Sequence, residues 1–178
     1  MCGSCSHECG QKCSKIVLLE PKVVLRGPSE PLLIPQLEIG QDQGFTVSHL
    51  CSHAKGCVKS VKVANISGKH TRPSDLRFSL VKDGTRVILE EFSCPPIGSS
   101  DPMNFDFGFA DDGLDQGLLS FCNAPAGPVG GGKVYKPLER LSAFKGIPVE
   151  GVWTLRILDV FRGASGVLEN WKLVIEYE

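Results

Sequence analysis

The stretch WTLRI at residues 153–157 and the stretch WKLVIEY at residues 171–177 decide the fold of this chain. In both stretches apolar side chains alternate with polar ones, which is the two-residue period of a strand with one buried face. Trp153 and Trp171 lie in phase with the apolar positions, so we expect both indoles to anchor the core. The two stretches predict antiparallel strands of a β-rich domain.

The same alternation occurs at residues 61–63 and 76–80, and turn signals separate the runs. Turns are expected at residues 82–84, 111–113 and 162–166, where Asp, Ser or Arg precedes glycine. No apolar stripe with a helical period is long enough to predict a helix, and 20 glycines with 12 prolines favour short strands. We therefore predict an all-β protein, either an antiparallel sandwich or a barrel.

The composition excludes several classes of protein. The 178 residues fit about one domain, and 42% hydrophobic with 22% charged residues is typical of a globular protein rather than a disordered one. A net charge of −1 argues against a nucleic-acid binder and a polybasic membrane surface. No apolar stretch is long enough for a transmembrane segment.

Three segments follow from this pattern. Residues 1–15 form a cysteine-rich N-terminal segment, and residues 16–31 form an extended, proline-containing arm that is expected to be an edge strand or to cross a surface. From about Phe45 onward, the two-residue alternation that is typical of strands dominates. The glycine-rich stretch 124–133 is expected to be a loop. No buried strand and helix flank it, so we do not expect it to bind phosphate.

Eight cysteines are present, and four of them lie in the first thirteen residues: Cys2, Cys5, Cys9 and Cys13. These four could form disulfides or hold a tetrahedral zinc ion. The first residues contain no secretory signal. The compartment is therefore secreted or lumenal if a signal was removed, and otherwise that of an intracellular or organellar complex.

The other four cysteines are disulfide candidates. Cys51 and Cys57 flank a five-residue connection, and opposite positions of a hairpin bring two cysteines close enough to bond. A zinc site that uses these two thiols with His53 is the alternative. Cys94 and Cys122 would form the last pair.

Acidic residues form the remaining candidate site. Asp111 and Asp112 lie in an expected turn, while Asp75 and Asp159 lie at the ends of strands. Calcium takes carboxylate and carbonyl oxygens, so such a group could bind it. The alternative is that these aspartates cap their own turns.

No signature of nucleophilic catalysis is found. The chain has no G-x-S-x-G motif, and its four histidines lie in polar, turn-rich stretches. His70 precedes Asp75 by five residues, but no serine or cysteine signature completes a triad. We therefore expect no enzymatic activity.

The run YKPLERLSAFKGIPVEGVWTLRILDVFRGASGVLENWKLVI at residues 135–175 resembles the end of the P domain (Homo B domain) of subtilisin-like proprotein convertases. The shared pattern is phenylalanine–x–glycine, then glycine–x–tryptophan–threonine–leucine, then glycine–x–leucine–x–x–tryptophan–x–leucine. Upstream, His70-Thr71 and Asp75-Leu76 are similar to a strand pair of that family. The likeness extends from about Leu32 to the C-terminus, so it implies a sandwich domain over residues 32–178.

The resemblance implies a jelly-roll sandwich of about eight strands that is non-catalytic and packs on a protease domain. In that family it tunes calcium and pH dependence, which favours calcium at Asp75, Asp111, Asp112 and Asp159. No catalytic domain precedes the matching region, so we expect an interaction or assembly module with a protein partner rather than a convertase. The alternatives are an accessory subunit of a larger complex, with its N-terminal cysteines held by zinc or disulfides, and a carbohydrate-binding sandwich.

Overall fold

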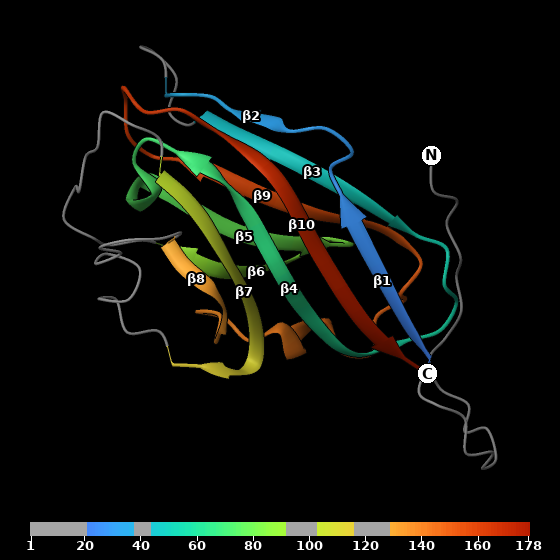
Figure 1. Ribbon diagram of the computed structural model, residues 1–178. Coiled ribbons are helices and arrows are strands. Elements are labelled where there is room, and N and C mark those ends of the chain that lie inside the picture. Colours follow the sequence, from blue (N-terminus) through green and yellow to red (C-terminus); the bar gives the residue numbers. More distant parts are fainter. Residues whose placement is uncertain (1–20, 38–43, 92–102, 116–128) are drawn as a thin grey trace.

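The computed structural model describes residues 21–37, 44–91, 103–115 and 129–178 (Figure 1). These residues form ten strands and two 3-10 turns: β1 (Lys22–Gly27), β2 (Leu32–Ile34), β3 (Gly44–Ser52), β4 (Val58–His70), η1 (Pro73–Asp75), β5 (Leu76–Lys82), β6 (Thr85–Glu91), β7 (Met103–Leu114), β8 (Val129–Tyr135), η2 (Leu141–Phe144), β9 (Gly151–Asp159) and β10 (Gly166–Tyr177). In the described residues no helix is long and apolar enough to span a membrane.

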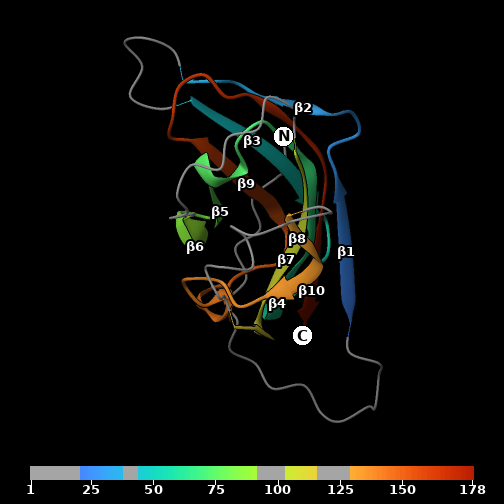
Figure 2. The same cartoon turned by 60° about the vertical axis from the view of Figure 1, so that its left-hand side comes forward.

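The strands form two sheets that face each other (Figures 1 and 2). Sheet A has the order β1-β10-β4-β7-β8, with β2 also paired to β10, and sheet B has the order β3-β9-β5-β6. All neighbouring strands are antiparallel except β7 and β8. The predicted all-β sandwich is confirmed.

The described residues form ten strands rather than the expected eight or so, and two strands account for the difference. The arm contributes β1, an edge strand that pairs along its whole length with β10. The second is β8, which overlaps the glycine-rich stretch that was expected to be a loop. For residues 129–133 that expectation was wrong, because Gly130 has a φ of 87° and packs on β7, where a Cβ atom would lie 2.7 Å from the Cβ of Phe107; residues 124–128 lie outside the described residues. Glycine here permits a close strand contact rather than a loop.

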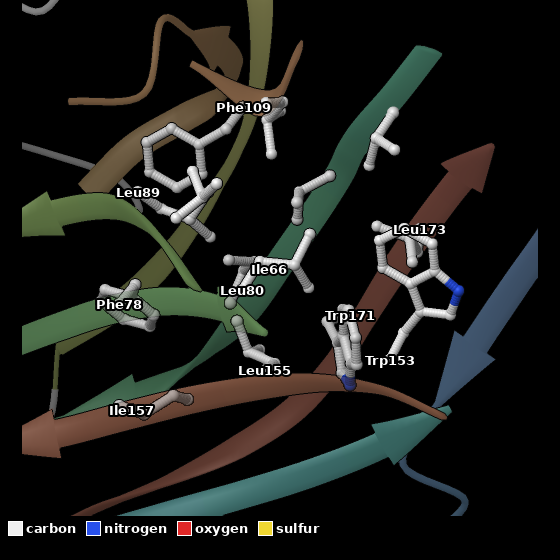
Figure 3. Close-up of a cluster of buried hydrophobic side chains, with 14 of the residues drawn as sticks. Ile66, Phe78, Leu80, Leu89, Phe109, Trp153, Leu155, Ile157, Trp171 and Leu173 are labelled. Carbon is white, nitrogen blue, oxygen red and sulfur yellow. The ribbon is translucent and has the colours of Figure 1, made fainter. Parts of the chain in front are cut away.

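The core fills the space between the sheets. Figure 3 shows side chains from β4, β7 and β10 of sheet A pointing toward those of β5, β6 and β9 of sheet B. Trp153 and Trp171 are fully buried, as predicted. The Trp153 indole donates to the carbonyl of Val149 at 3.1 Å, and the Trp171 indole donates to the Ser48 hydroxyl at 2.8 Å.

Candidate functional site

A buried polar cluster lies at one end of the sandwich, where β4 and β9 terminate. His70 and Asp159 are fully buried, and Nε2 of His70 faces Oδ2 of Asp159 at 3.3 Å. Nδ1 of His70 accepts the backbone N–H of Arg72 at 3.1 Å. A nitrogen that accepts a hydrogen bond carries no proton, so this contact leaves Nε2 as the donor nitrogen of the ring.

Asp75 belongs to the same cluster and is also buried. Its Oδ2 lies 3.3 Å from Nε of Arg72. Burial of the carboxyl raises the pKa of Asp75 above its ordinary value, the Arg72 guanidinium opposes that rise, and the nearby Asp159 adds to it. The backbone carbonyl of Asp75 accepts the N–H of Val160. The cluster thus joins η1 to the segment that follows β9.

Glycine at position 166 seals this cluster on the side of β10. Gly166 is paired with His70, and a Cβ atom there would lie 2.0 Å from the carbonyl oxygen of Lys69 and 2.6 Å from the His70 ring. No side chain fits in that space. The strand backbone therefore lies directly on the imidazole and keeps water away from it.

The contacts of this cluster suit a structural role rather than proton transfer. A histidine acting as a general base needs one nitrogen oriented by a carboxylate and the other facing a nucleophile. In His70 the second nitrogen is taken by the N–H of Arg72. The Asp159 carboxylate also accepts the N–H of Phe161 at 3.0 Å, an Asx turn of the kind weighed as the alternative to calcium.

The four predicted calcium ligands do not converge. Asp75 and Asp159 lie together, but Asp111 is eight residues along β7 from Met103, the partner of His70. That separation is roughly 25 Å in an extended strand. The turn expected at residues 111–113 is also absent, because β7 runs through to Leu114.

Asp111 has a different task. Its Oδ1 accepts the N–H of Leu141 at 2.7 Å and its Oδ2 accepts the N–H of Ser142 at 2.9 Å, so it caps the first turn of η2. Asp112 is exposed. Across the described ranges, no group of three or more His, Cys, Asp or Glu side chains could hold a metal ion. The four-aspartate calcium site is therefore a prediction that the geometry does not support.

The predicted Cys51–Cys57 disulfide is also wrong. Cys51 has a free thiol and is exposed, whereas Cys57 is disulfide-bonded. The reason is the sheet pairing, since Cys51 pairs with Val152 on β9 while Cys57 bridges to Pro148. The two cysteines are therefore not opposite positions of one hairpin. Cys51, His53 and Cys57 also do not form a group that could hold a metal ion among the residues that the structure describes. The remaining candidates lie outside the described residues: Cys2, Cys5, Cys9, Cys13, Cys94 and Cys122.

Strand β3 points several apolar side chains toward solvent and several hydroxyls toward the core, unlike most strands at the surface of a sandwich. Its buried side chains are mostly hydroxyls, namely Thr46, Ser48 and Ser52 with Leu50. Its outward side chains are Phe45, Val47, His49 and Cys51. Phe45 is 55% exposed. A strand with one solvated face normally has the opposite pattern, with apolar side chains inward.

The apolar character continues across β9 and β5. The register places Phe45 beside Leu158 and Leu158 beside Arg77; the next outward row joins Val47, Arg156 and Ser79, and the third joins His49, Thr154 and Val81. We call the outward side chains of β3, β9 and β5 the sheet B face. Within the described residues no Asp or Glu occupies an outward position of these three strands.

A shallow, open depression of about 480 Å³ lies beside the far edge of sheet B. It is lined by Arg86, Val87, Glu139, Arg140, Ser142 and Ala143. Glu139 is already engaged, because its carboxylate accepts the N–H of Ile88 at 2.7 Å. Two arginines against one glutamate give the lining of this depression a net positive charge.

The sequence did contain a signal for the sheet B face. Apolar residues and hydroxyls alternate from Phe45 to Ser48, as in any half-buried strand. The alternation alone does not say which side faces the core. Only the pairing with β9 reveals that the hydroxyls are inside.

No family model and no curated protein matches this chain. Among solved structures, it is similar to a serine protease of Aeromonas sobria, with 20% identity and a TM-score of 0.45, and to an Aeromonas sobria serine protease solved in complex with the chaperone ORF2, with 18% identity and the same TM-score. Each match covers 90% of this chain and 28% of the other, so the chain corresponds to less than a third of those proteins.

Proposed function

We propose that this chain is a non-catalytic interaction module of the P-domain type, which binds a partner protein through the sheet B face. The observation that carries the proposal is the inverted pattern of β3. Thr46 and Ser48 are buried, while the Phe45 ring remains more than half exposed. An exposed aromatic ring on a sheet face, flanked by the half-buried Val47 and Leu158, is favoured at protein–protein contacts, where burial removes it from water.

The composition of the face also supports a protein contact. Aromatic residues and arginine are enriched at the centre of protein interfaces, where charged residues of other types are depleted. The Arg156 guanidinium lies 5.8 Å from the centre of the Phe45 ring. Phe45, Val47 and Leu158 surround this arginine in the register. The arrangement has the composition of an interface centre rather than of a solvated sheet.

Two further observations favour a non-catalytic role. His70 is fully buried, with Nδ1 accepting the N–H of Arg72 and Nε2 facing Asp159, so its ring is not accessible to a substrate. The resemblance of residues 135–175 to the P domain implies a domain that packs on another protein and performs no chemistry itself.

The proposal can be tested with variants that alter one face only. Phe45→Asp and Val152→Asp would each place a charge on the sheet B face, at side chains that are 55% and 37% exposed. Val24→Asp is the matched control, because Val24 is 43% exposed on β1 of the other sheet. Quantitative co-purification from the native source should recover a partner with wild type and with Val24→Asp, and lose it with the other two. Equal recovery by all four proteins would contradict the proposal.

The alternatives from the sequence stay predictions. A carbohydrate-binding role would be favoured by glycan binding that a free sugar competes, with no effect of Phe45→Asp on partner recovery. The accessory-subunit alternative depends on the N-terminal cysteines, which lie outside the described residues.

A further inference from the structure

We propose that the partner of the sheet B face is a different protein whose contact surface combines acidic with apolar side chains, and not a second copy of this chain. This inference rests on the proposed function, because it specifies the chemistry of the surface that the same face would bind.

The first argument is the sign of the charges. Arg77 and Arg156 both point outward from the sheet B face, and no acidic side chain accompanies them on the described positions of β3, β9 and β5. Glu91 lies opposite Arg77 on β6, at the border of the face. Arg86 on β6 and Arg140 in the adjoining depression extend the positive surface. A partner with carboxylates would complement it.

The second argument is how Arg156 is held. Its guanidinium lies 5.8 Å from the centre of the Phe45 ring, and Val47 is its neighbour in the register. An arginine stacked on an aromatic ring keeps its planar fork pre-organised, and that fork matches a carboxylate with two hydrogen bonds. The apolar side chains around it would exclude water from such a contact. The site therefore favours a carboxylate flanked by apolar side chains.

The third argument excludes this chain as its own partner. In a two-fold symmetric dimer through the sheet B face, each copy would present its arginines to the same surface of the other copy, and like charges would be brought together. The outer face of sheet A does not complement it either. Its acidic side chains already have polar partners: Asp106 accepts from Asn65, Glu169 pairs with Lys69 at 3.6 Å, and Glu176 accepts from Ser60 at 2.8 Å.

The test uses two synthetic peptides with the same Leu and Phe residues, alternating with Glu in one peptide and with Lys in the other. Each is titrated into the isotopically labelled full chain and followed by NMR. The Glu peptide is expected to shift resonances of β3 and β9 and to bind more weakly as salt is added. Arg156→Gln should weaken it about tenfold. Lys172→Gln, on the outer face of sheet A, is the control and should bind like wild type.

Three results would overturn the inference: no binding of the Glu peptide, equal binding of the Lys peptide, or an unchanged affinity in Arg156→Gln. Thermal unfolding of Arg156→Gln checks that the variant is folded, which is expected because the side chain points outward. Sedimentation velocity separates this inference from the proposed function. A wild-type dimer that Phe45→Asp dissolves would refute the acidic partner and leave protein binding by this face intact. If Phe45→Asp loses the native partner but the Glu peptide does not bind, the acidic partner is likewise refuted while protein binding by this face stands.

Discussion

The indole N–H of Trp171 on sheet A donates to the hydroxyl of Ser48 on sheet B at 2.8 Å, so one buried hydrogen bond joins the two sheets. A buried indole needs an acceptor, and β3 supplies it by turning Ser48 toward the core. Since side chains alternate along a strand, the same choice turns Val47 outward. The outward position of Val47 on the sheet B face is thus a consequence of supplying a hydrogen-bond acceptor to the indole N–H of Trp171.

Ser48→Ala should destabilise the protein by about 1–3 kcal/mol, because it leaves the Trp171 N–H buried without an acceptor. The free energy of unfolding, measured in urea, gives the effect. Ser79→Ala is the control, as Ser79 points outward from β5 and its loss should change stability by less than about 0.5 kcal/mol. Equal losses in the two variants would show that the hydrogen bond contributes nothing specific.

Asp111→Ala should cost about 1–2 kcal/mol, since the carboxylate caps two backbone N–H groups at the start of η2. The neighbouring variant Asp112→Ala should be nearly neutral, because that side chain is exposed and no hydrogen bond to it is described. Thermal melts of both variants, with and without calcium, provide the measurement. A calcium-dependent stabilisation that Asp112→Ala abolishes would restore the calcium hypothesis for this strand.

Local pattern predicted the strands around Trp153 and Trp171 because the alternation of their side chains is a property of each strand alone. It failed where the outcome depends on distant residues. Whether Asp111 caps a helix turn depends on residues 141 and 142, which are 30 and 31 positions away. The glycine-rich strand β8 exists because β7 accepts it, which the composition of residues 124–133 could not reveal.

The same limit applies to the buried cluster. His70 and Asp159 are adjacent in space because two strands end at the same rim, and their separation in sequence gave no sign of it. The resemblance to a known family placed Asp75 and Asp159 at one rim, which is where they lie. It did not indicate that the side chains of His70 and Arg72 would accompany them.

Alkylation of the native protein without reductant should modify Cys51, whose thiol is free and exposed, and should spare Cys57. Peptide mapping after digestion gives the modified positions. Reduction before alkylation should add Cys57 to the labelled set, and Cys51→Ser should remove only the first site. Recovery of a peptide in which Cys51 and Cys57 are joined by a disulfide would contradict the free thiol of Cys51.

The last prediction concerns pH and Asp75. Burial raises the pKa of this carboxyl above its ordinary value of 3.8, so the folded state holds the proton more tightly than the unfolded state does. The resulting stabilisation is fully present below about pH 3.8 and is lost as the pH rises through the folded pKa. Asp75→Asn cannot ionise, so the free energy of unfolding of wild type minus that of the variant should fall as the pH rises through this window. Denaturant unfolding of both proteins at each pH gives this difference. A difference that is constant, or that grows with pH, would mean that the Arg72 contact outweighs desolvation at this site.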